Sequence, residues 1–205
     1  MRRRVISILM VLVMLLTMLP TTAVAAMFEE EDYAATVYVN GSSGNNSNSG
    51  TTDEDPVKTM TVAYEKLYAL MDAAGKKTDP DSVGRIVITG NVSFSSTNGP
   101  TPNNSTYSGG ENHVFTVLVT GQTSDVGMNI KLDYNNLGPT VYENITLTKH
   151  NDSENLTYFC ANGYPLTIGE GVTCVAKSNG YHFNLVGGKK TADYFGDSDL
   201  TRLKW

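Results

Sequence analysis

The sequence predicts an all-β domain in which short strands wind into stacked coils behind a single N-terminal α-helix. The stretch from Thr59 to Ala74 has the three- and four-residue apolar spacing of an amphipathic helix. The rest of the chain after residue 35 is built of short β-branched runs, with Asn and Gly at the corners between them. An apolar residue followed by Thr also recurs at a nearly constant spacing, at Ile145, Leu156 and Leu166. A β-sandwich is the alternative, but we favour a solenoid of coils because the repeat is regular.

The N-terminal segment 1–25 has the three parts of a secretory signal peptide. Three Arg follow Met1, an apolar run extends from Val5 to Leu19, and Ala23-Val24-Ala25 supplies a cleavage site. This run is shorter than the roughly 20 residues that a membrane-spanning helix needs, although an uncleaved anchor remains the alternative. We therefore expect an extracellular or cell-surface protein without a transmembrane segment after cleavage.

Charge and length narrow the classes of function. Removing 1–25 takes away three Arg and no acid, which leaves 12 basic against 21 acidic side chains and a net charge of −9. This balance argues against a nucleic-acid partner, because nucleic-acid-binding proteins present a basic face. The remaining length suits one domain. We expect a flexible lead over 26–35 and a β-helix domain over 36–205. Within that domain, 36–94 forms the cap and first coil, 95–110 a surface loop and 111–205 further coils.

The elements follow in order from local composition. Thr36–Val39 is β-branched and aromatic, which predicts a strand, and the Asn/Gly/Ser-rich run Asn40–Thr52 predicts a loop. Thr59 is a suitable N-cap and Gly75 a suitable stop for the helix. The apolar runs before and after Gly90-Asn91 are too closely joined for a hairpin, so we expect them to turn one corner of a coil.

Later strands are expected at His113–Thr120, Asn129–Tyr134 and Gly138–Leu147. A new strand begins at Asp199-Leu200-Thr201, with no capping segment after it. An uncapped coil leaves an exposed strand edge. We therefore expect a C-terminal end that is truncated relative to a longer surface protein, with downstream domains as partners.

The two cysteines, Cys160 and Cys174, enclose a short loop. In a secreted chain they are candidates for a disulfide, which would stabilise the fold by ~3 kcal/mol through loop closure. Two buried thiols in neighbouring strands are the equal alternative. His113, His150 and His182 share no spacing, and we interpret them as structural or solvent-facing. Without a Cys-x-x-Cys pair or paired-His spacing, the sequence predicts neither a zinc site nor another cofactor.

Three segments together resemble a known family. Val37-Tyr38-Val39, then Gly44–Thr51, then Pro56-Val57-Lys58-Thr59 before a helix resembles the entry of right-handed parallel β-helix proteins of the pectate-lyase-like superfamily. The later coils look like those of large secreted surface proteins from gut Firmicutes. The resemblance implies a right-handed parallel β-helix whose first coil is capped by the helix. Asn46 stands where this family's entry loop usually has Asp, which removes the expected charge from that loop.

Function is open between three hypotheses. The first is a noncatalytic, adhesin-like module that contacts a glycan or a host surface, since solenoids offer long faces. Its candidate sugar-stacking residues are four tyrosines: Tyr107, Tyr134, Tyr142 and Tyr181. The second is a polysaccharide lyase or glycoside hydrolase of the same superfamily, for which Asp133 and Glu143 are the first candidate acids, with Glu170 and Asp193 as further acids in or near strands. The third is a purely structural spacer without a ligand.

Overall fold

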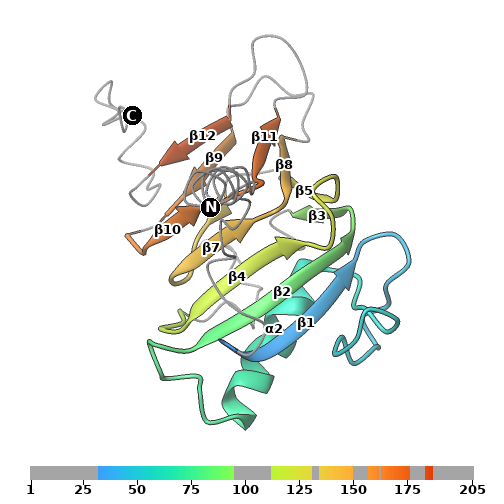
Figure 1. Ribbon diagram of the computed structural model, residues 1–205, viewed down its shortest axis with the longest axis vertical. Helices are drawn as coiled ribbons and strands as arrows, with labels where there is room; N and C mark the ends of the chain where they lie inside the picture. The colour runs from blue at the N-terminus through green and yellow to red at the C-terminus, as the bar shows by residue number, and fades with distance from the viewer. Residues whose placement is uncertain are drawn as a thin grey trace, which may run out of the picture. The chain divides into compact units, whose positions relative to one another are not determined.

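Every strand pairing in the described part of the chain is parallel. The computed structural model describes residues 32–94, 112–130, 134–149, 157–161, 163–175 and 183–186. The first sheet contains β1 (Tyr33–Asn40), β2 (Val83–Gly90), β4 (Thr116–Gly121), β7 (Thr140–Glu143) and β10 (Leu166–Ile168), side by side in chain order (Figure 1). The second contains β3 (Val92–Phe94), β5 (Gly127–Ile130), β8 (Thr146–Lys149) and β11 (Thr173–Val175). The third contains β6 (Tyr134–Asn135), β9 (Thr157–Cys160) and β12 (Phe183–Val186). The expected all-β class, with parallel strands and one helix, is confirmed for these residues.

The chain visits the three sheets in a fixed order. From β4 onward, the chain passes in turn through one strand of the first sheet, one of the second and one of the third, and then starts again. We call each such set of three strands a round. Leu118 pairs with Val141 of the next round, and Thr140 pairs with Leu166 of the round after that. These partners are about twice as far apart in the chain as the repeated apolar-Thr pairs of the sequence. The spacing of those pairs therefore corresponds to the distance between successive strands of the chain rather than between successive rounds.

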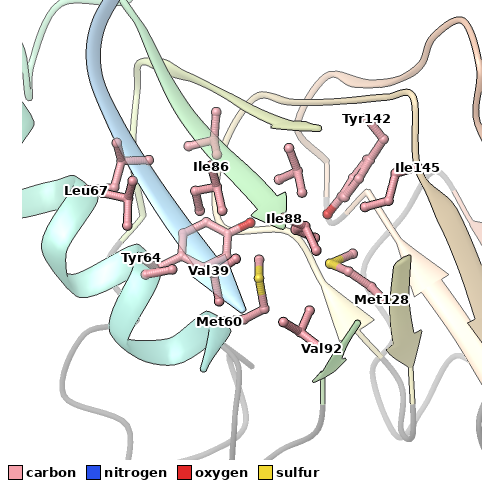
Figure 2. Packing of buried hydrophobic residues seen from close by; sticks show 14 of the residues in the cluster. Val39, Met60, Tyr64, Leu67, Ile86, Ile88, Val92, Met128, Tyr142 and Ile145 are labelled. Carbon is pink, nitrogen blue, oxygen red and sulfur yellow. The ribbon is translucent and has the colours of Figure 1, made fainter. Parts of the chain in front are cut away.

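Because the strands are parallel, apolar residues of successive strands lie next to one another in columns. In the first sheet Val37, Ile86, Val119 and Tyr142 are paired in turn, and the column continues to Ile168. In the second sheet the column is Val92, Met128, Leu147 and Cys174. Except for the last member of each column, these side chains are at most 1% exposed. Figure 2 shows Ile86, Val92, Met128 and Tyr142 converging in one core.

The single helix of the described residues, α2 (Met60–Ala73), covers the core beside β1, β2 and β3. The side-chain oxygen of Thr59 accepts from Val62 N, and Gly75 ends the helix with φ +68°. Lys76 N then donates to Met71 O at 2.8 Å, so the last turn keeps its carbonyls satisfied. The predicted helix and both of its predicted end signals are confirmed.

The buried face of α2 is wider than its aliphatic spacing indicated. Tyr64 and Tyr68, which lie outside the aliphatic stripe of the helix, are 2% and 7% exposed. They lie one turn apart on the side of α2 that continues to Met71. Aromatic rings are large enough to reach the core from the border of the apolar stripe.

The loop between β1 and α2 closes the outer edge of β1. Asn40 N donates to Val57 O at 2.8 Å and Val57 N to Tyr38 O at 3.0 Å. Asn46 Oδ1 accepts from Lys58 N at 3.0 Å and from Thr59 N at 3.1 Å. Asn46 therefore holds the start of α2, a role that does not need the carboxylate of the family pattern.

Asn side chains form the corners between the first and second sheets. Asn91 separates β2 from β3, and its Oδ1 accepts from Gly127 N at 2.8 Å. Asn144 separates β7 from β8 with φ +46°, a backbone region that Asn tolerates better than most residues. Its Nδ2 donates to Gly121 O at 3.1 Å. The predicted corner at Gly90-Asn91 is confirmed, since β2 and β3 belong to different sheets.

Val119→Ala should lower the free energy of unfolding by about 2–3 kcal/mol, because it removes two methyl groups from a fully buried column and leaves a cavity. Urea denaturation measures this change. The matched control is Val175→Ala, which truncates a 38% exposed strand residue and should change stability by less than about 0.5 kcal/mol. Equal losses in the two variants would contradict the assigned core.

Asn46→Ala should destabilise the protein by about 1 kcal/mol, because Lys58 N and Thr59 N both lose their acceptor. Asn46→Asp keeps that acceptor and places a negative charge at the N-terminus of α2, which should add about 0.5 kcal/mol at low ionic strength. Urea denaturation at low and high salt separates the two effects. Equal destabilisation by Ala and Asp would show that this amide does not act as a cap.

Candidate functional site

A cavity of about 130 Å³ lies where the C-terminal half of α2 meets the segment that leads into β4. We call it the ring pocket. Its aromatic wall consists of three rings, and its other lining residues are mostly polar. The lining residues are Tyr68, Lys77, Thr78, Asn112, His113, Val114 and Phe115.

The three rings of this pocket pack on one another. The ring centroids of Tyr68 and His113 are 5.8 Å apart, and those of Tyr68 and Phe115 are 5.9 Å apart with an edge-to-face tilt of 76°. The centroids of His113 and Phe115 are 5.0 Å apart. These separations lie in the favourable range for aromatic pairs, so the rings form a fixed wall.

A hydrogen bond and a glycine hold His113 in place. Its Nδ1 lies 2.8 Å from Phe115 O, and its backbone N donates to Leu137 O at 3.0 Å. Gly138 lies directly behind it, and a Cβ at that position would collide with the His113 carbonyl and ring. This close approach requires glycine at position 138.

The turn after α2 positions the polar residues of the pocket. Asp79 Oδ2 accepts from Lys76 Nζ at 2.9 Å and from Ser82 Oγ at 2.8 Å. These contacts, with Lys76 first, hold the pKa of Asp79 well below its usual value, at about 2. Ser82 O also accepts from Thr116 N at 3.0 Å, which ties the turn to the start of β4. Lys77 and Thr78 belong to this turn.

Burial sets the charge of His113. The imidazole is 6% exposed, and its burial lowers its pKa to about 4 despite the opposing effect of the Phe115 hydrogen bond. The ring is therefore neutral at pH 7. Because a carbonyl oxygen only accepts hydrogen bonds, Nδ1 carries the proton and Nε2 is the acceptor.

Acid should destabilise the fold through His113. The unfolded chain binds a proton below pH 6.5, whereas the folded chain resists protonation until about pH 4. The contribution of neutral His113 to the free energy of unfolding is therefore complete above pH 6.5 and is lost as the pH falls towards 4. Its size is about 3 kcal/mol for a shift of this order. Urea denaturation from pH 7.5 to 4 should show a steeper loss in wild type than in His113→Gln, and parallel curves would contradict this.

Among the candidate tyrosines, Tyr142 requires a correction. The sequence predicts a sugar-stacking residue on the surface, but Tyr142 is 1% exposed and packs in the core column (Figure 2). β7 is buried on both faces, as parallel strands often are, so alternation did not reveal which side chains face the core. Tyr107 and Tyr181 lie outside the described residues. Tyr134 is in β6, and its side chain lies outside the described part of the structure.

Of the candidate acids, Glu143 and Glu170 are described, whereas Asp133 and Asp193 lie outside the described residues. Glu143 ends β7 and is half-buried. Burial first, and repulsion from Glu170 second, raise the pKa of Glu143. Asn144 N donates to Glu170 O at 2.8 Å, which fixes the backbone that carries Glu170 beside this corner. The charge of Glu170 thus acts on Glu143, and both acids are among the candidates of the sequence analysis.

Cys174 has a free, exposed thiol in this structure. Partial burial nevertheless raises its pKa, so the thiol stays protonated. Cys160 lies in β9, but its side chain is outside the described residues, and the Cys160–Cys174 disulfide remains a prediction.

The described residues contain no group of three or more His, Cys, Asp or Glu side chains placed to hold a metal ion. No helix among them is long and apolar enough to cross a membrane.

The ring pocket escaped the sequence analysis because its members come from three separate segments. His113 shares no spacing with another His, and Tyr68 has no distinguishing motif. One signal was available: Tyr64 and Tyr68 lie one turn apart on α2, which marks an aromatic edge beside the apolar stripe.

Comparisons with protein-family models, with curated proteins and with solved structures give no match for this chain. The resemblance to the pectate-lyase-like superfamily therefore remains a prediction.

Proposed function

We propose that the chain is a noncatalytic extracellular or cell-surface module, built as a right-handed parallel β-helix of the pectate-lyase-like type, that contacts a glycan or a host surface. The fixed order in which the chain visits three parallel sheets supports the β-helix. The pattern of residues 1–25 supports secretion.

The observation that carries the proposed contact is the composition of the first sheet on the face turned away from the core. Strand alternation places Tyr38 on this face, because its neighbours Val37 and Val39 are in the core. Thr120 and Glu143 follow Tyr38 in the same row across the sheet, beyond Val87. All three are partly exposed. Thr120 and Glu143 lie on adjacent strands, and Tyr38 lies one further strand away across Val87. Along this row an aromatic ring can stack on a sugar, and a hydroxyl and a carboxylate can bind sugar hydroxyls.

The neighbouring row strengthens this edge of the sheet. The Arg85 guanidinium lies 4.3 Å from the centroid of the Tyr33 ring, and Arg85 Nε donates to Thr36 Oγ1 at 3.3 Å. The cation–π contact and the hydrogen bond orient the guanidinium on the face that also carries Tyr38. The edge formed by β1 and β2 is thus an ordered polar and aromatic surface.

Tyr38→Ser should weaken binding of the purified protein to its best ligand on a glycan array by about tenfold, the value of one lost stacking contact of about 1.4 kcal/mol. Tyr164→Ser is the matched control, because Tyr164 is also partly exposed but lies in the turn before β10. It should bind as wild type does. A folded wild-type protein that binds nothing on the array would instead support the structural spacer.

A second candidate function follows from Glu143 and Glu170. A pair of carboxylates, one with a raised pKa, is what a glycoside hydrolase uses as general acid and partner. The enzyme alternative therefore rests on Glu143, because the other first candidate, Asp133, lies outside the described residues. Release of reducing or unsaturated sugar ends from a broad polysaccharide panel, abolished in Glu143→Gln, would replace the noncatalytic proposal.

A further inference from the structure

We propose that α2 and the turn after it separate from residues 112–116 when His113 becomes protonated, while the stacked rounds stay folded. This contact is an acid-sensitive switch at the end of the molecule that α2 covers. It acts whether or not the protein binds a glycan.

Three elements enclose the His113 imidazole. α2 contributes the Tyr68 ring, whose centroid lies 5.8 Å from that of His113. Phe115, which leads into β4, contributes a ring with a centroid distance of 5.0 Å. On the side of β7, the backbone of Gly138 abuts the imidazole so closely that a Cβ there would collide with it. The imidazole is 6% exposed, so water reaches it fully when one of these elements moves away.

The cavity indicates which element moves. The ring pocket lies between α2 with its turn on one side and residues 112–115 on the other, whereas Gly138 does not line it. Atoms that line a cavity lack packing partners on that side, so less dispersion attraction opposes their separation. The backbone hydrogen bond from Thr116 N to Ser82 O, at 3.0 Å, joins the two sides. We therefore expect the protein to open along the cavity rather than at the side of β7.

A proton added to His113 meets no opposite charge in the closed form. Nδ1 already donates to a backbone carbonyl, so the added proton is carried by Nε2. The titratable residues that face this ring are Tyr68 of α2 and Lys77 of the turn, and Lys77 adds a second positive charge. No Asp or Glu is among the described residues of the lining, and neither Leu137 nor Gly138 carries a charged side chain. Opening hydrates the imidazolium, so protonation favours the open form.

The acid of the turn does not respond in the same range of pH. Asp79 accepts hydrogen bonds from Lys76 and Ser82, which hold its pKa at about 2. Asp79 therefore stays ionised at pH 5, and the turn keeps its internal contacts when it moves. Opening at this pH then depends on the imidazole of His113.

Hydrogen exchange of the full chain at pH 7.5 and pH 5, corrected for the intrinsic effect of pH and followed by mass spectrometry, measures the opening. Residues 67–82 and 113–116 should exchange about 30-fold faster at pH 5, because opening restores the ordinary pKa of 6.5 to a ring whose pKa is about 4 when closed. The corrected rates in β2 and β7 should not change. His113→Gln has no imidazole to protonate and should abolish the acceleration.

Asp79→Asn is the matched control. It loosens the turn without removing the imidazole, so exchange of the turn should rise at both pH values and the pH-dependent factor should remain. NMR titration of the His113 ring in the wild-type protein is a second readout, and it should give a pKa of about 4. This titration decides the question if His113→Gln does not fold.

Three results would overturn the proposal. Equal acceleration in every strand would show that acid unfolds the whole protein rather than this contact. Unchanged exchange at pH 5, or acceleration that persists in His113→Gln, would show that the imidazole does not control the opening. A His113 ring that titrates at its ordinary pKa of 6.5 would show that the closed contact does not resist protonation.

Discussion

The stacking of one apolar residue on the next across parallel strands is the interaction on which the rest of the structure depends. β1, β2, β4 and β7 each contribute one member to the column from Val37 to Tyr142, and the two inner members, Ile86 and Val119, are covered on both sides by their neighbours in the column. Burying a side chain of this size stabilises the fold by about 1.5–3 kcal/mol. Each added round therefore stabilises the column. The apolar side chains at its two ends lack a neighbour on one side and must be covered by other parts of the protein.

The end of the column at Val37 is covered by α2 and the loop before it, which are not part of the repeat. α2 supplies Met60, Tyr64 and Leu67 to the core, and the loop before it pairs with the open edge of β1. This loop must pass very close to the sheet. A Cβ at Gly44 would collide with the carbonyls of Val57 and Asn40, so glycine is needed there. The far end differs, because Ile168 is only half-buried and Cys174 is exposed, although both occupy column positions.

The sequence predicted the parts of the fold that are determined locally. α2 followed from its spacing and caps, and the corner at Asn91 followed from the short join between two apolar runs. It did not predict which residues of β7 face the core. Val141 and Tyr142 are both buried, so this strand has no alternation of apolar and polar residues that would mark the face turned to the core. The length of a round was hidden for a related reason: strands of all three sheets carry similar short motifs, so the strongest spacing was the one between neighbouring strands.

The ring pocket was not predicted because it lies where the repeat is interrupted. Lys77 and Thr78 come from the turn that leaves α2, whereas His113 and Phe115 precede β4. In the repeated rounds, each strand position has an equivalent neighbour above and below, and the side chains fill the space between them. At the cap, a helix packs beside strands, and a helix and a strand do not present matching surfaces along their length. The mismatch is filled by aromatic rings that pack at an angle to one another, and the cavity remains beside them.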